Sequence, residues 1–296
     1  MRKITFKQLM TRIISALLVF TMLISSGSMP AYAATKKKLS KSSENVTAVF
    51  KAKKVKSLKS DATFKNAMAN SAVKLLQETI KQDKSGGNIL ISPDSVFSAV
   101  EMAYLGSAKK TRSEIKKTLG GIDAKKYAGY LKAMHKRIHK SKSLTYDVAN
   151  SLWYKKKKIT MKKSFLKNVV SYSDADIYAA PFNKKTVTDI NNWTYNNTNG
   201  KIPSIIQQLD PDARCILINA IYFKGAWEDQ YPETVKRPFT DEKGAVTNKK
   251  MLEGTEHVYV QVNGAEGFVK PYRGGQIAFV GLLPPEGTSV DDYVAG

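Results

Sequence analysis

Apolar residues recur every three or four positions through most of residues 61–200, which is the spacing of amphipathic helices. Ser92 precedes Pro93, and this pair is typical of the cap and the first position of a helix. The run TRSE, which begins at Thr111, matches the capping box that opens a short helix. The pattern therefore predicts helices over residues 61–85, 93–106, 111–120, 124–140, 161–172 and 186–200.

Other apolar runs lack the helical spacing and predict strands. Residues 88–91, NILI, and 144–154, LTYDVANSLWY, have this character. Residues 214–225, RCILINAIYFKG, are apolar on both faces, which favours a central position in a sheet. From Arg237 onward, short apolar runs alternate with glycine turns and indicate a region rich in hairpins. Helices first and mixed strands later predict an α+β protein.

The first 33 residues have the pattern of a secretory signal peptide. Basic residues precede the apolar stretch 13–24, and Ala31-Tyr32-Ala33 matches a cleavage site. The apolar stretch is short for a membrane span, and no later segment is long enough to be one. The sequence therefore predicts an exported bacterial protein without a membrane span, either secreted to the extracellular space or associated with the cell surface.

Residues 34–60 contain nine lysines and one acidic residue, Glu44, and lack regular apolar spacing. This composition predicts a disordered basic linker, with the folded domain beginning at residue 61. The whole chain carries a formal net charge of +23, of which four charges belong to the predicted signal peptide. For an exported protein this excess favours cell-wall polymers or polysaccharides as polyanionic partners, and no nucleic acid is expected. A generally solvated, lysine-rich surface is the alternative.

Two residues of the run 214–225 suggest chemistry. Asn219 interrupts the apolar pattern, and a buried amide without partners costs about 1–3 kcal/mol, so it is expected to have hydrogen-bond partners. Cys215 is the single cysteine, so the sequence predicts no internal disulfide. A small buried residue is a better interpretation of Cys215 than a nucleophile, because no histidine lies near it in the sequence.

Two histidines have the spacing of metal ligands. His135 and His139 are four positions apart on the predicted helix 124–140. However, the run HKRIH lacks the glutamate of a metalloprotease, and Lys136 and Arg137 would repel a cation. A solvated basic face is therefore the favoured interpretation. Since no nucleophile elbow, phosphate-binding glycine loop or paired CxxC occurs, neither an enzyme nor a metal or cofactor is predicted.

Five runs of the sequence resemble successive motifs of the serpin family, in the family's order and at similar spacing. They begin at residues 88, 149, 198, 217 and 281 and read NILISPDSVFSAVEMAYLGSAKKTRSEIKKTLG, ANSLWY, TNGKI, LINAIYFKGAW and GLLPPEG. The resemblance covers residues 61–296. It implies three β-sheets with eight or nine helices, and suicide inhibition of serine, sometimes cysteine, proteases. In that mechanism a cleaved bait loop inserts as a new strand into the largest sheet.

The resemblance also implies roles for individual residues. In serpins the asparagine of this strand belongs to the shutter, a hydrogen-bonded group at the middle of the sheet that opens. Carried over to this sequence, the shutter comprises Ser92, Ser95 and Asn219. Trp227 resembles the tryptophan of the breach, where loop insertion begins. Ordinary helix capping, a satisfied asparagine and a core aromatic residue are the alternatives.

Several parts of a serpin find no match in this sequence. The hinge, the bait loop with its reactive centre and the histidine that completes the shutter are not recognised, and the three histidines, His135, His139 and His257, lie elsewhere. The sequence is therefore interpreted as a C-terminally incomplete serpin, with a truncated domain 61–296 that is non-inhibitory in this form. Because specificity is set by the bait loop, the target protease stays open.

Lys125, Lys132, Lys136 and Lys140 fall on one side of the predicted helix 124–140, opposite its apolar face. In some serpins the corresponding helix binds sulfated polysaccharide. The resemblance and the spacing together name these lysines as a candidate polyanion site. A secreted basic surface protein without inhibitory activity is accordingly the alternative function, and a merely solvated face has equal weight.

Overall fold

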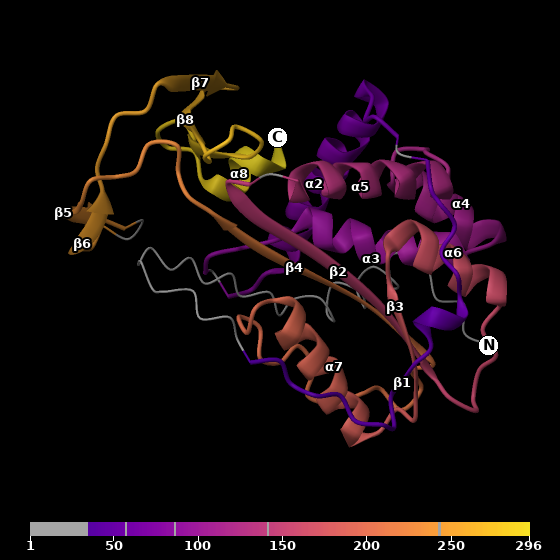
Figure 1. Cartoon of the computed structure of the whole chain (residues 1–296). Coiled ribbons are helices and arrows are strands. Elements are labelled where there is room, and N and C mark those ends of the chain that lie inside the picture. The colour runs from indigo at the N-terminus through magenta and orange to yellow at the C-terminus, as the bar shows by residue number, and fades with distance from the viewer. Residues whose placement is uncertain (1–34, 57, 86, 141, 242–243) are drawn as a thin grey trace. The chain divides into compact units, whose positions relative to one another are not determined.

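A computed structural model describes residues 35–296 except 57, 86, 141, 242 and 243 (Figure 1). The predicted signal peptide lies outside this range. Over the described residues the chain forms seven α-helices, one short 3-10 helix and nine strands in three sheets, which confirms the α+β class. Within the same residues, no helix combines the length and the apolar character that crossing a membrane requires.

The helices are α2 (Ala62–Gln82), α3 (Pro93–Gly106), α4 (Lys109–Thr118), α5 (Ala124–His139), α6 (Lys163–Ser173), α7 (Lys184–Asn197), α8 (Val290–Ala295) and the 3-10 helix η1 (Thr47–Val49). The strands are β1 (Glu44–Asn45), β2 (Leu144–Lys155), β3 (Asp176–Ala180), β4 (Cys215–Gly225), β5 (Thr234–Thr240), β6 (Val246–Leu252), β7 (Val258–Val262), β8 (Ala265–Pro271) and β9 (Ala278–Leu283). One sheet has the strand order β1-β3-β2-β4, a second pairs β5 with β6, and a third has the order β7-β8-β9.

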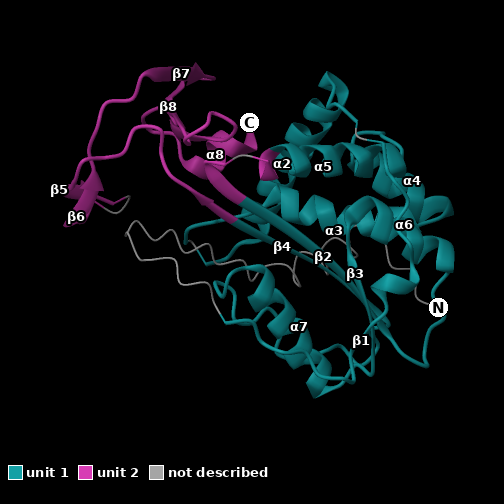
Figure 2. Cartoon of the chain, viewed as in Figure 1, with its two compact units in different colours: residues 1–137, 146–222 teal, residues 138–145, 223–296 magenta. Residues whose placement is uncertain are grey.

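The chain divides into two compact units (Figure 2). Among the described residues, unit 1 contains those up to Arg137 together with Tyr146–Tyr222. Unit 2 contains Ile138–Thr145 and Phe223–Gly296. Unit 1 therefore holds α2 to α4, α6, α7 and most of the four-stranded sheet, and unit 2 holds the hairpins β5 to β9. The hairpin-rich region expected from Arg237 onward is confirmed.

In unit 1 the four-stranded sheet is covered on both faces. Strands β2 and β3 pair in parallel, with Leu152 opposite Ile177 and Trp153 opposite Tyr178. Leu152 and Ile177 belong to a large apolar core with helices α2 to α6, whereas Trp153 and Tyr178 belong to a second core with α7. Because side chains alternate along a strand, the two cores lie on opposite faces. Figure 1 shows α7 on one side of this sheet and α3 and α6 on the other.

The position of β4 differs from the expected one. Its middle residues, 218–221, are at most 8% exposed, as the apolar composition indicates. Among the described strands, however, β4 lies at the end of the order and has β2 as its neighbour. Its burial comes from the helices above and below the sheet rather than from strands on both sides. The apolar composition of a strand indicates that both of its faces are buried, but it does not indicate whether the strand has neighbours on both edges.

Three local predictions are wrong. Residues 88–91 form no strand, and the extended backbone recorded before α3 is that of its cap residue Ser92. Helix α4 begins at Lys109, and its cap residue Ala108 makes no side-chain hydrogen bond. Ser107 already caps the end of α3. The connection from α3 to α4 is therefore too short to extend to Thr111, where the capping box was predicted. Helix α7 begins at Lys184 instead of residue 186, because Asn183 forms a capping box with Thr186.

Residues 35–56, which were expected to belong to a disordered linker, instead lie along unit 1. The carboxylate of Asp189 on α7, a residue only 2% exposed, accepts hydrogen bonds from Ser40 N at 2.7 Å, Ser40 Oγ at 2.6 Å and Ser43 Oγ at 2.6 Å. Strand β1 then pairs antiparallel with β3. The segment is ordered by polar contacts with residues far along the chain, which its own lysine-rich composition does not reveal.

The same segment makes further contacts at both of its ends. Lys37 N donates to Asn196 Oδ1, and Asn196 Nδ2 donates to Lys37 O, each at 2.8 Å. Leu58 packs against α5 at Gly129, where a Cβ would lie 2.8 Å from Leu58 Cδ1. A larger residue than glycine at position 129 would therefore push Leu58 away. We refer to residues 37–43, which contact α7, as the N-terminal strap.

Candidate functional site

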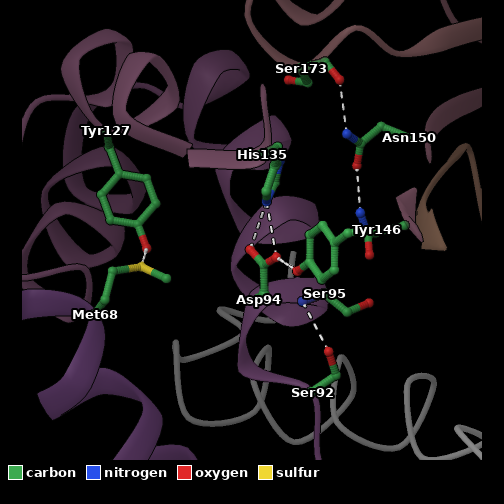
Figure 3. A network of polar contacts seen from close by, with 10 residues as sticks. Met68, Ser92, Asp94, Ser95, Tyr127, His135, Tyr146, Asn150 and Ser173 are labelled. Carbon is green, nitrogen blue, oxygen red and sulfur yellow. Dashed lines mark hydrogen bonds and ion pairs between the residues drawn. The ribbon is translucent and has the colours of Figure 1, made fainter. Parts of the chain in front are cut away.

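The predicted serines lie at the start of α3. Ser92 caps this helix, with its Oγ accepting a hydrogen bond from Ser95 N at 3.4 Å, and Pro93 occupies the first turn (Figure 3). Ser95 is 3% exposed. The expected capping is confirmed. Within the described structure, however, no hydrogen bond joins either serine to Asn219.

Asn219 has a different partner. It is 8% exposed, and its Nδ2 donates to Asn150 Oδ1 on β2 at 2.9 Å. Asn150 is 7% exposed, and its own Nδ2 donates to the main-chain oxygen of Ser173 at 2.8 Å (Figure 3). The prediction that Asn219 has an arranged partner is confirmed. Its membership of a shutter with the two serines stays a prediction.

These hydrogen bonds continue into the helices. Asn150 lies two positions before Leu152 on β2, and Leu152 packs in the core of α2 to α6, so the amide points to that face of the sheet. Ser173, the last residue of α6, donates from its Oγ to Glu101 Oε2 on α3 at 2.8 Å. We call the set Asn219, Asn150, Ser173 and Glu101 the polar chain. It connects β4, β2, α6 and α3 through groups that are largely buried.

Glu101 is the titratable member of the polar chain. It is 2% exposed, and burial raises the pKa of its carboxyl to about 8, although the hydrogen bond from Ser173 and the charge of Lys132 lower it. The carboxyl is therefore mostly protonated and neutral at pH 7. In the part of the chain that the structure describes, Glu101 Oε1 and Asn219 Oδ1 have no hydrogen-bond partner.

A second polar group surrounds Asp94 in the first turn of α3 (Figure 3). His135 Nε2 of α5 lies 2.9 Å from both carboxylate oxygens, and the Tyr146 hydroxyl of β2 donates to the same carboxylate. Burial and the nearby Asp94 charge raise the pKa of Tyr146, which keeps its hydroxyl a donor. The side chain of His135 is 17% exposed, so it does not belong to a solvated face. Through the Asp94 carboxylate, this group joins α3, α5 and β2.

Metal and thiol chemistry find no support in the described residues. They contain no group of three or more His, Cys, Asp or Glu side chains placed to hold a metal ion. Cys215 is partly buried, and burial raises the pKa of its thiol to about 12, so it stays protonated at neutral pH. A weakly reactive packing residue is the role that this environment allows.

Trp227 belongs to an aromatic group in unit 2. Its ring stacks on Tyr272 with a centroid distance of 4.2 Å, and the ammonium of Lys270 lies 5.8 Å from its ring centre. Lys270 is 3% exposed and forms an ion pair with Glu256 at 2.7 Å. The buried cation is thus compensated by one carboxylate and by aromatic faces. The breach role of Trp227 stays a prediction.

The four candidate lysines are not equivalent. Lys125, Lys136 and Lys140 are exposed. Lys132, in contrast, donates to a main-chain oxygen of α6 at 2.9 Å and to Asp174 Oδ1 at 2.5 Å, and its side chain is 28% exposed. Its charge is largely neutralised by Asp174, so it is a poor candidate for binding a polyanion. The difference arises because α6 ends beside this part of α5.

Of the polar chain, only Asn219 was predicted from the sequence as a site residue, and of the Asp94 group only His135 was considered. Asn150 lies inside the run ANSLWY, two positions before Leu152. Both side chains therefore point to the same face of the strand, and this spacing marks Asn150 as a polar residue on a buried face. Glu101 lies between Val100 and Met102 on a helix with little polar surface, which is the signal of a buried charge. Ser173 carries no such signal, because its role depends on where α6 ends.

Comparisons with known proteins identify the family of this chain. The family model described as serpin (serine protease inhibitor) matches residues 66–295. Leukocyte elastase inhibitor A of Rattus norvegicus is 29% identical over 236 residues, which cover 74% of this chain and 60% of that protein. Iripin-3 of Ixodes ricinus is 31% identical over 224 residues, which cover 70% of this chain and 56% of that protein.

The fold is found among solved structures as well. The thermophilic serpin Tengpin in its native state superposes with a TM-score of 0.79 at 32% identity, covering 86% of this chain and 65% of that one. Tengpin in the latent state gives a TM-score of 0.75 at the same identity. The chain spans about 60% of the length of the curated relatives it matches. The family model covers most of its residues, and the chain belongs to the serpin family.

Proposed function

We propose that the protein encoded by the native gene inhibits serine, or cysteine, proteases by the suicide mechanism of its family, and that it acts outside the cell. The observation that supports this proposal most directly is the buried hydrogen bond between Asn219 and Asn150, which joins β4 to β2 in the middle of the sheet. The predicted signal peptide supports an extracellular location.

A polar contact at this place suits a sheet that opens. Interlocked apolar side chains resist separation because every contact is lost at once. A hydrogen bond between two amides breaks and re-forms with a new partner, and the free Asn219 Oδ1 offers a second acceptor.

The inhibitory function is tested with proteases of several specificities. The protein from the native gene should form a band at the summed mass on a denaturing gel, because suicide inhibition leaves the protease covalently attached. An elastase is the first enzyme to use, since several relatives are named leukocyte elastase inhibitors. Enzymes with trypsin-like, chymotrypsin-like and subtilisin-like specificity follow, and cleavage without any such band would contradict the proposal.

Residues 34–296 alone should form no covalent band with any of these enzymes. We expect this because no hinge or bait loop is recognised within residues 34–296, and the mechanism needs both a bond to cut and a tethered strand to insert. The same gels provide the measurement, with the protein from the native gene as the positive control. A denaturant-stable band with residues 34–296 alone would show that a bait lies within them.

Polyanion binding is a second candidate function, and one observation favours it. The N-terminal segment brings its own exposed lysines, Lys51, Lys53, Lys54 and Lys56, to the same unit as Lys125 and Lys136. The contact between Leu58 and Gly129 shows that this segment reaches helix α5. Two basic regions that are separate in the sequence therefore combine, and cell-wall polymers or sulfated polysaccharides have the matching charge.

The charge of this surface is tested by retention on a heparin column. The double variant Lys125→Ala/Lys136→Ala should elute at clearly lower salt, because each lost phosphate- or sulfate-like contact reduces counterion release. A control variant, Lys249→Ala/Lys250→Ala on β6, removes the same charge from unit 2 and should elute closer to the parent protein. Equal elution of both variants would mean that α5 plays no particular part and that only total charge matters.

A further inference from the structure

Glu101 is an unusual residue for the centre of a folded domain. Its side chain lies on α3 among buried residues such as Val100 and Met102, and it is 2% exposed. One carboxyl oxygen accepts the hydrogen bond from Ser173, and the other has no partner in the described structure. A carboxylate in this place would have lost its water and gained a single hydrogen bond, which is a costly arrangement.

The hydrogen bond to Glu101 is one of the contacts that fix the end of α6. Ser173 also receives the Asn150 amide on its main-chain oxygen, and β3 begins three residues later at Asp176. The start of α6 also lies close to α3, because a Cβ added at Gly106 would lie 2.6 Å from the ring of Phe165. The end of α6 is therefore held between α3 and the sheet, and Glu101 touches it from the α3 side.

The charged groups around Glu101 come from the neighbouring elements. Lys132 of α5 favours the ionised carboxyl, and Asp174, directly after α6, opposes it. Lys132 is itself engaged by Asp174 at 2.5 Å, so its charge is only partly available to Glu101. Glu101 in turn contributes to raising the pKa of Tyr127 on α5. No group in this set forms an ion pair with Glu101.

We propose that Glu101 is a proton-controlled latch: as a neutral acid it stays buried and holds the end of α6 against α3. Its ionised form accepts the Ser173 hydrogen bond more strongly, but the buried charge is so costly that the contact opens to water, which releases Ser173 and, through Ser173, the Asn150–Asn219 pair of the sheet. The released state is a local opening in which the carboxylate reaches water. This inference is independent of protease inhibition, because it concerns the stability of contacts within unit 1.

The direction of the pH effect follows from proton linkage. The pKa of Glu101 is about 8 in the closed arrangement and near its ordinary value of 4.5 once the carboxyl is solvated. The closed state is therefore most stable below about pH 4.5, loses stability as the pH rises to about 8, and changes little above that. Between these limits the population of the open state rises by up to about tenfold per pH unit.

Hydrogen exchange of the protein from the native gene tests the latch. Exchange is measured by mass spectrometry from pH 5.5 to 8 and corrected for the intrinsic rate at each pH. Peptides that cover residues 168–176 and 147–152 should exchange up to about tenfold faster per pH unit in the parent protein. In Glu101→Gln this dependence should vanish, because the amide still accepts the Ser173 hydrogen bond and does not titrate.

Two further variants make the outcome decisive. Glu78→Gln on α2 removes an exposed carboxylate and should keep the parent pH dependence. Glu101→Met also removes the titration and replaces Glu101→Gln if the amide prevents folding. A pH dependence that persists in both Glu101 variants would overturn the latch. If the exchange of every peptide, including those of α2, depended equally on pH, ionisation of Glu101 would act on global unfolding. That result would overturn the latch as well.

Discussion

Replacing Asp189 by alanine should lower the free energy of unfolding by about 3 kcal/mol and release the N-terminal strap from α7. The substitution leaves Ser40 N, Ser40 Oγ and Ser43 Oγ without their common acceptor. Hydrogen bonds to a charged group contribute roughly 1.5–3 kcal/mol each, and buried donors left unpaired add a penalty, while release of the strap recovers part of the loss. Urea denaturation measures the change in stability.

Limited proteolysis distinguishes release of the strap from a general loss of stability. In the Asp189→Ala variant, cleavage within residues 37–43 should be much faster than in the parent protein, under conditions where unit 1 stays folded. Ser43→Ala removes one of the three hydrogen bonds and should cost about 1 kcal/mol. The control Lys41→Ala alters an exposed neighbour and should change stability by less than about 0.5 kcal/mol. Parent-like cleavage of Asp189→Ala would show that other contacts hold the strap.

Replacing Asn219 by alanine should lower the free energy of unfolding by about 2 kcal/mol. The change removes the donor to Asn150 Oδ1 and leaves that oxygen buried between β2 and α6. It also removes Asn219 Oδ1, which has no partner in the described structure, so the effect is smaller than for a fully bonded amide. Under the proposed function, the loosened sheet should also insert its own loop or polymerise more readily.

A double-mutant cycle isolates the contact between the two asparagines. Asn219→Ala, Asn150→Ala and the double variant should show a coupling energy of about 1 kcal/mol in urea denaturation. Asn248→Ala, which alters an exposed asparagine on β6, serves as the control and should leave stability nearly unchanged. Additive effects of the two substitutions would mean that the hydrogen bond does not stabilise the sheet, and the shutter role of Asn219 would lose its main support.

Much of the secondary structure of unit 1 can be predicted from residues that lie close together in the sequence. The helices α2, α3, α5 and α6 lie within a few residues of the predicted ranges, because one turn of an amphipathic helix is specified by residues three and four positions apart. The Ser92 cap is local in the same sense, since it involves Ser95 on the next turn. The family motifs added the expectation of three sheets, which the structure confirms.

Apart from the local errors at residues 88–91 and at the starts of α4 and α7, the failures share one cause, which is that the decisive partner lies far away in the sequence. Residues 35–56 were expected to be disordered because their own composition provides no core, yet Ser40 binds Asp189, which lies 149 positions away in the sequence. Lys132 appears equivalent to Lys125 on a helical wheel, but Asp174 lies beside one and not beside the other. His135 appears solvated until the fold places Asp94 against it.

For the candidate site, the sequence by itself determined that Asn219 needs a hydrogen-bond partner, because a buried amide must be satisfied wherever it lies. Only the tertiary structure decided that the partner is Asn150, that Asn150 continues to Ser173, and that Ser173 ends at Glu101. Hydrogen bonds are short and directional, so their partners depend on how β4, β2, α6 and α3 are packed together. The apolar pattern along β4 shows that Asn219 needs a hydrogen-bond partner. The packing of β4, β2, α6 and α3 determines which residue provides it.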